Sequence, residues 1–166
     1  MYYSTYLKYF TLEEDIKGAG NEIFVTRKYY KLTPRITAEK KTEYDKVQIN
    51  QNDALKSNDL VEVELNVEAK NNYEYLVFED MKPAGFEPVE LRSGHQYAGG
   101  LCSNMELRDE KVVFFITNLK QGNHKITYKV RAEVPGKFHT MPTNGYAMYV
   151  PEIKGISDEL RVEIED

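Results

Sequence analysis

Three histidines and one cysteine are the side chains of this sequence best suited to catalysis or metal binding: His95, His124, His139 and Cys102. The histidines lack the close paired spacing of a compact zinc site, so a metal centre would need ligands from distant segments. We therefore expect surface or capping histidines, with no metal and no other cofactor. A Cys102 thiol activated by His95 would be a nucleophile. No strand-to-helix turn or evident third group accompanies the pair, so we do not expect it to be catalytic.

Other catalytic motifs are missing from the sequence. It contains no G-x-S-x-G nucleophile elbow, H-E-x-x-H zinc motif, P-loop or dinucleotide-binding glycine motif. Glu79 and Asp80 are adjacent carboxylates, but neighbours in a strand point to opposite faces. We interpret them as polar residues that close a strand, and we predict that the protein is not an enzyme.

Alternating apolar and polar residues predict the strands that would position these side chains. In residues 61–69 (VEVELNVEA), the apolar residues fall on one face, and Glu62, Glu64, Asn66 and Glu68 fall on a face expected to be wet. The same period recurs in residues 125–134 and 159–166. Further candidate strands are residues 3–11, 22–32, 73–79 and 111–118.

These short strands, separated by turns rich in glycine and proline, predict an all-β fold. We expect an antiparallel β-sandwich of the fibronectin III-like or macroglobulin-like type, with residues 1–166 as a single domain. Residues 33–58 are polar and only 47–49 read as a strand, so we predict a long irregular connection or insertion there. The three glycines of residues 93–104 predict a mobile loop.

Charge and hydropathy limit the possible partners. The formal net charge is −5, which argues against binding to nucleic acid or to an anionic membrane surface. No stretch is apolar enough to span a bilayer, and no secretory signal peptide is visible. Aromatic alternation begins at the first residues, which suggests a piece excised from a longer protein.

Four stretches resemble a known family: residues 2–32, 74–89, 106–138 and 145–164. They include RDEKVVFF (108–115), a YKVRA run followed by PGKF (128–138), and AMYVPE (147–152). Together they resemble the C-terminal macroglobulin-like domain of bacterial alpha-2-macroglobulins, also known as large extracellular alpha-helical proteins. The resemblance follows the chain in order but does not cover residues 33–58 and 93–104.

The resemblance implies a sandwich fold and a role in protease inhibition. Members of this family offer a bait region to a protease, rearrange on cleavage and entrap the attacker, and many carry a thioester in a Cys-x-Glu-Gln stretch. Cys102 is followed by Ser103, Asn104 and Met105, so it is not the thioester cysteine. We expect the bait region, and any thioester, upstream in a parent chain that is periplasmic or extracellular.

The resemblance also assigns a role to the segment YAMYVPEIKG (146–155). It implies that Met148 and Tyr149 pack over the thioester of a helical domain in the same parent chain. The expected partners are therefore other domains of the parent and, through the parent, proteases; the isolated domain is expected to be monomeric. Alternatively, Tyr146 and Met148 alternate into the domain's own core while Tyr149 caps it.

A second class of function stays open from the sequence. With 13 tyrosines and no tryptophan, the chain could be a free-standing carbohydrate- or protein-binding module. Its candidate stacking residues are Tyr2, Tyr3, Tyr6, Tyr9, Tyr29 and Tyr30. Cross-strand aromatic packing within the sheets would explain the same residues, and we favour it.

Overall fold

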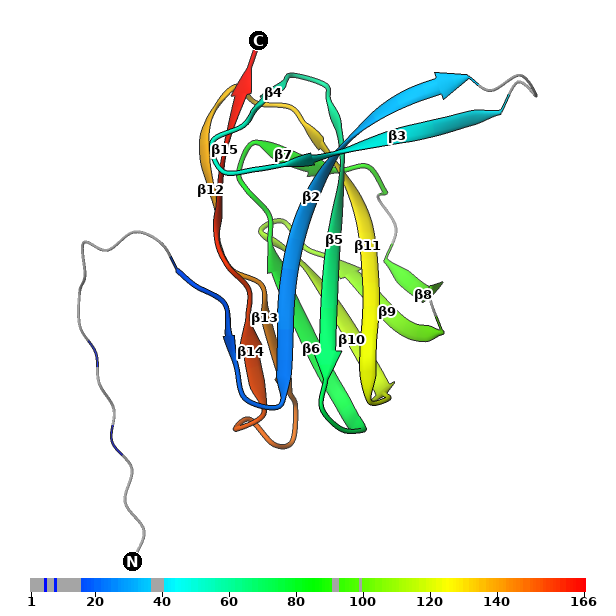
Figure 1. The fold of residues 1–166 in the computed structure, drawn as a ribbon, viewed down its shortest axis with the longest axis vertical. Helices are drawn as coiled ribbons and strands as arrows, with labels where there is room; N and C mark the ends of the chain where they lie inside the picture. The colour runs from blue at the N-terminus through cyan, green and yellow to red at the C-terminus, as the bar shows by residue number, and fades with distance from the viewer. Residues whose placement is uncertain (1–4, 6–7, 9–15, 37–40, 91–92, 99) are drawn as a thin grey trace, which may run out of the picture.

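Two antiparallel sheets, with a smaller third sheet at one end, make up the fold (Figure 1). The computed structural model describes residues 5, 8, 16–36, 41–90, 93–98 and 100–166. The described part contains strands and no helix, and therefore no helix that could cross a bilayer. This confirms the predicted all-β, antiparallel sandwich class. The predicted strand at 3–11 lies almost entirely outside the described residues.

The largest sheet has seven strands, and the second has five. In spatial order the first comprises β1 (Ala19–Gly20), β14 (Lys154–Ile156), β13 (Asn144–Ala147), β6 (Tyr73–Met81), β10 (Lys111–Leu119), β9 (Leu101–Leu107) and β8 (Gly94–Ala98). The second comprises β3 (Thr42–Ile49), β2 (Ile23–Ile36), β5 (Leu60–Ala69), β11 (Gly122–Ala132) and β7 (Phe86–Pro88). The third comprises β12 (Gly136–Thr140), β15 (Leu160–Glu165) and β4 (Ala54–Lys56), with β4 parallel to β15.

The core lies between the facing sides of the two large sheets, as the period-two pattern predicts. Phe78 of β6 and Phe114 of β10 are fully buried in one sheet, and Val63 and Leu65 of β5 are buried in the other. The rings of Phe114 and Tyr128 meet across the gap with their centroids 5.8 Å apart. Aromatic and branched side chains therefore supply the apolar area that stabilises the sandwich.

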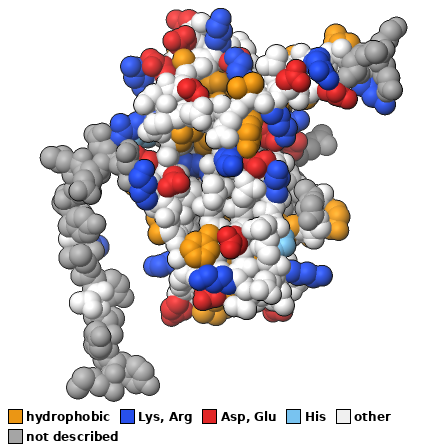
Figure 2. All heavy atoms as spheres, viewed as in Figure 1, with side chains coloured by type: hydrophobic (Ala, Val, Ile, Leu, Met, Phe, Trp, Pro, Cys, Tyr) orange, Lys and Arg blue, Asp and Glu red, His pale blue; other side chains and the backbone are white. Residues whose placement is uncertain are grey.

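The outer face of the five-stranded sheet differs from its prediction at Glu62 and Glu64, which are buried rather than wet. Lysines from other strands of the sheet cover them: Lys46 of β3 pairs with Glu62, and Nζ of Lys125 of β11 lies 2.9 Å from Glu64 Oε2. Long lysine stems shield a carboxylate from water while keeping their own ammonium groups exposed. Figure 2 shows basic and acidic side chains interspersed over this side of the molecule.

Two stretches predicted to be irregular contain paired strands. Within residues 33–58, β2 continues to Ile36 and pairs with β3, and the two form a hairpin arm that projects from the sandwich (Figure 1). Nearly all of β3 is exposed, so no one-sided apolar pattern marks the arm. Within 93–104, β8 and β9 form a hairpin rather than an unpaired loop.

Candidate functional site

The loop that joins β13 to β14 carries Met148 and Tyr149, the two residues singled out from the sequence. Gly145 and Ala147 are buried on the inner side of β13, and a Cβ at Gly145 would lie 2.6 Å from the Phe78 ring. This close approach leaves no room for larger side chains on that side. Tyr146 is half-buried and Met148 is exposed, so the alternative in which both alternate into the core is wrong.

Four apolar side chains gather at this loop, and we call them the tip cluster: Tyr75, Met148, Tyr149 and Val150. Tyr149 is 75% exposed, Met148 and Val150 are each 47% exposed, and Tyr75 is 44% exposed. The rings of Tyr75 and Tyr149 meet edge to face, with centroids 5.4 Å apart and an interplanar angle of 79°. The cluster lies at the end of the sandwich where the β13–β14 loop and the β5–β6 turn emerge (Figure 1).

Backbone hydrogen bonds hold the loop in one shape. Ala147 N–H donates to Ile153 O at 3.0 Å, and Ile153 N–H donates to Val150 O at 2.9 Å, which closes a turn around Pro151. Met148 N–H donates to Tyr75 O at 2.8 Å, which ties the loop to β6. The apolar side chains are therefore exposed on an ordered backbone.

Tyr75 has an unusual backbone conformation for a residue inside a strand. Its φ is +55°, and among the described residues it is the only one besides glycines and asparagines with a positive φ. In the pairing of β6 with β10, Leu76 and Glu74 each have a partner, but Tyr75 between them has none. A bulky side chain in the left-handed region costs roughly 1–3 kcal/mol. No feature of the sequence indicated this strain.

A second cluster lies in the middle of the sandwich, and we call it the buried ion-pair centre: Arg27, Asp80, Tyr128, Thr140 and Thr143. Arg27 Nη1 lies 2.5 Å from Asp80 Oδ1, and the two side chains are 1% and 0% exposed. Arg27 Nη2 also donates to Thr140 O at 2.8 Å. Tyr128 Oη donates to Asp80 Oδ2 at 2.7 Å, and Thr143 Oγ1 donates to Asp80 Oδ1 at 2.9 Å.

This arrangement corrects the interpretation of Asp80 as a strand-closing polar residue. Asp80 faces the core on the same side as Leu76 and Phe78, whereas Glu79 pairs with Lys111 at 2.7 Å in a partly exposed position. Because Asp80 already accepts three hydrogen bonds from side chains, it is poorly placed to act as a base. It joins β2 and β11 of one sheet to β6 of the other.

Burial and charge set the pKa values of the groups in and beside this centre. Burial raises the pKa of Tyr128 well above its usual value, and the nearby Asp80 charge adds to the rise. Burial also raises the pKa of Tyr29, whose ring lies beneath the Arg27 guanidinium. Burial lowers the pKa of Arg27, but Tyr29 and Asp80 outweigh that effect and leave it raised. Arg27 therefore stays a cation in the centre, Tyr128 stays neutral, and the adjacent Tyr29 is neutral as well.

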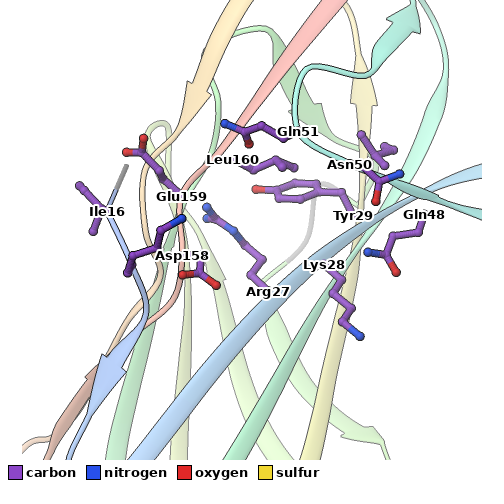
Figure 3. Close-up of a pocket in the computed structure, with 12 residues that line it drawn as sticks. Ile16, Arg27, Lys28, Tyr29, Gln48, Asn50, Gln51, Asp158, Glu159 and Leu160 are labelled. Carbon is purple, nitrogen blue, oxygen red and sulfur yellow. The ribbon is translucent and has the colours of Figure 1, made fainter. Parts of the chain in front are cut away.

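A polar cavity of about 360 Å³ lies beside the centre. Figure 3 shows Arg27 and Tyr29 extending from β2 toward the segment that carries Asp158, Glu159 and Leu160. Among the described residues that line the cavity, the buried atoms Tyr29 Oη and Glu159 Oε1 have no hydrogen-bond partner. Thr140 is close enough to Tyr29 to lower its pKa, but the two hydroxyl groups are not in hydrogen-bonding geometry. Such a site suits ordered water. It presents no pairing of a nucleophile with a base.

The remaining candidate residues do not converge. Cys102 is exposed opposite Tyr97 on β8, and His95 lies opposite Asn104. His124 Nε2 lies 2.7 Å from Lys120 O, and His139 is exposed on β12. No group of metal-ligating side chains occurs among the described residues.

The tyrosines considered for sugar stacking are also accounted for where the structure describes them. Tyr29 is buried, so it cannot stack on a ligand, and Tyr30 is half-buried on β2. Tyr2, Tyr3, Tyr6 and Tyr9 lie outside the described residues. Neither of the two described tyrosines therefore offers an exposed ring for stacking, whereas Tyr149 of the tip cluster does.

Comparison with known families gives one match that covers most of the chain. The family model described as the bacterial alpha-2-macroglobulin MG10 domain matches residues 23–152. No curated protein matches the chain.

Solved structures share the fold. Trypsin-activated alpha-2-macroglobulin from Escherichia coli aligns with 89% of this chain, at 21% identity and a TM-score of 0.64. Salmonella alpha-2-macroglobulin reacted with methylamine aligns with 89% at 20% identity and a TM-score of 0.63. Native E. coli alpha-2-macroglobulin from domain MG7 to the C-terminus aligns with 88% at 21% identity and a TM-score of 0.62. This chain spans 11%, 10% and 24% of those three chains respectively.

Proposed function

The chain belongs to the bacterial alpha-2-macroglobulin MG10 domain family, and from this premise we propose that it is a non-catalytic docking domain of a protease-inhibiting macroglobulin. In this proposal the tip cluster lies against a helical thioester domain of the same parent chain. Met148 and Tyr149 then cover the thioester until a protease cleaves the parent. The parent acts in the periplasm or outside the cell.

The observation that carries the proposal is the exposure of Met148 and Tyr149 on an ordered loop. Isolated exposed apolar residues are common on protein surfaces, but adjacent ones that form a patch mark sites of interaction. Here Tyr75 contacts the Tyr149 ring, and Val150, the next residue in the loop, is also exposed. Burying these four side chains against a partner would remove apolar area from water, which favours docking.

The residue types suit a cover over a reactive bond. A thioester is lost when water or a small amine reaches its carbonyl carbon, so a shield must exclude both. Tyrosine offers a large rigid ring, and methionine fills irregular gaps because its chain is flexible and polarisable. The Salmonella relative was solved after reaction with methylamine, which is a small amine of the kind that a shield must exclude.

The solved relatives also contain neighbours for such a domain. Each of the three chains compared above is far longer than this one, so its domain of this fold is part of a larger assembly. A change in how domains pack after cleavage would withdraw the tip cluster and expose the bond. Rigid-body movement between two packed states is a common way to make such a switch.

The test is the reaction of the full parent chain with methylamine, followed as the release of a free thiol. We expect Tyr149→Ala to accelerate the reaction. Because an aromatic contact contributes about 0.5–1.5 kcal/mol beyond its buried area, the expected acceleration is about two- to tenfold. Tyr97→Ala is the matched control, since Tyr97 is 78% exposed on β8 at the opposite edge of the sheet.

Equal rates for Tyr149→Ala and the unaltered parent would refute the shielding role. A parent that releases no thiol has no thioester to shield, and that result would refute it as well. The melting temperatures of both variants should match that of the parent, because each substitution removes a mostly exposed ring.

A further inference from the structure

We infer that Tyr75 is a positioning residue that holds the tip cluster in the shape in which it meets its partner. The inference rests on the proposed function of Met148 and Tyr149, and it adds the residue on a different strand that sets their orientation. Tyr75 lies on β6, more than seventy positions before the loop in the sequence. Neither the chain pattern nor the family resemblance assigned it a role.

The first argument is the backbone of Tyr75. A φ of +55° is comfortable for glycine but strained for a bulky residue. In an ordinary strand the backbone at this position would continue the β6–β10 ladder, yet the register skips Tyr75. Tyr75 therefore lacks regular strand pairing with β10 and has a strained backbone, although its side chain is 44% exposed. Burial of the Tyr75 ring in the domain's own core does not explain this.

The second argument is that Tyr75 makes two contacts with the loop. Its carbonyl oxygen accepts the Met148 N–H at 2.8 Å. Its ring meets the Tyr149 ring edge to face at 5.4 Å. The last β13–β6 pair in the register is Ala147↔Leu76, so the Tyr75–Met148 bond continues the attachment one residue into the loop. One residue thus fixes both the backbone of Met148 and the ring of Tyr149.

A loop held in its docking shape loses less conformational entropy when it docks. Without the Tyr75 ring, Tyr149 would keep its exposure but lose the neighbour that limits its rotation. The cluster would then sample several orientations, and only a fraction of them would fit the partner. Tyr75 therefore acts through Tyr149 and Met148.

The experiment compares Tyr75→Gly and Tyr75→Phe in the full parent chain by hydrogen exchange of the amides of residues 147–153. Glycine accepts the positive φ but removes the ring, whereas phenylalanine keeps the ring and the strain. We expect Tyr75→Gly to raise exchange about tenfold or more at Met148, whose N–H donates to Tyr75 O, and to accelerate the reaction with methylamine. We expect Tyr75→Phe to retain the parent's exchange and reaction rate, because the edge-to-face contact needs only the ring.

Unchanged exchange in Tyr75→Gly, or equally fast exchange in Tyr75→Phe, would overturn the inference. A Tyr75→Gly chain that fails to fold would overturn it too, since Tyr75 would then serve the fold rather than the loop. The proposed function is judged separately by Tyr149→Ala. If that variant reacts at the parent's rate, shielding fails, while exchange in the Tyr75 variants still decides whether Tyr75 positions the loop.

Discussion

The buried ion-pair centre and the tip cluster reverse the usual placement of polar and apolar side chains. The centre encloses a charged arginine and a charged aspartate in the middle of the sandwich. The tip cluster leaves tyrosine, methionine and valine side chains in water at one end. Both arrangements forgo stability when unpartnered, because burying a charge opposes folding and apolar side chains left in water gain nothing from burial.

The two regions differ in whether that cost is offset within the domain. In the centre, hydrogen bonds from Arg27, Tyr128 and Thr143 satisfy Asp80. In the tip cluster, the Tyr75–Tyr149 contact covers only part of the exposed rings. A buried polar group with its partners in place points to a structural role, whereas an ordered apolar group that stays exposed points to a partner outside the domain.

The largest effect that would test this comparison is expected from Asp80→Asn. The substitution leaves Arg27 as a buried cation without its counter-charge, which costs about 3–5 kcal/mol of the free energy of unfolding. Denaturant unfolding measures it. Glu79→Gln is the matched control, because Glu79 pairs with Lys111 where both side chains are about a quarter exposed, and we expect a loss below about 1 kcal/mol.

Similar small losses for Asp80→Asn and Glu79→Gln would mean that the centre does not hold the sheets together. The buried ion-pair centre would then not differ from an exposed ion pair in its contribution to stability, and the contrast with the tip cluster would be wrong.

A smaller effect is expected at alkaline pH. Tyr29 and Tyr128 have raised pKa values in the folded state because they are buried, whereas tyrosine in the unfolded chain ionises near pH 10. The folded state therefore binds these protons more tightly, so their contribution is fully present below about pH 10 and is lost as the pH rises above it. The expected slope is about 1.4 kcal/mol per pH unit for each tyrosine.

Unfolding measured from pH 9 to pH 12 checks this slope. Tyr128→Phe should be less stable at neutral pH, because it loses the bond to Asp80, but its stability should fall less steeply above pH 10. If Tyr128→Phe lost stability above pH 10 as steeply as the unaltered protein, Tyr128 would not be a source of the pH dependence, which would contradict this prediction.

The parts of the fold that the sequence predicted are those in which one face of a strand packs on the core. β5 and β11 both alternate apolar and polar residues because one side of each strand packs on the core, although the outward Glu62 and Glu64 of β5 are buried as well. The β2–β3 arm has no such side and gave no pattern. The sequence predicted that Glu62 and Glu64 face water. Their burial could not be predicted from the pattern of β5, because the lysines that cover them come from other strands.

The candidate sites divide in the same way. Met148 and Tyr149 were named through the family resemblance, which identified a loop that periodicity alone left ambiguous. The role of Asp80 was missed because a lone aspartate at the end of a strand resembles a solvated residue. One signal was available: Asp80 continues the period of two set by Leu76 and Phe78, which places it on the buried face of β6. Its partner, Arg27, falls on the buried face of β2 in the same way. Tyr75 was missed because a positive φ at tyrosine has no sequence pattern.

Photo-crosslinking from position 149 in the full parent chain tests the central claim most directly. Tyr149 would be replaced by benzoylphenylalanine, and Tyr97, which is similarly exposed, would be replaced in the same way as a reference. We predict that the probe at position 149 crosslinks within the parent to residues beside the thioester, and that cleavage by a protease abolishes this crosslink. A probe at 149 that captures no more of the parent than the probe at 97 would contradict the account.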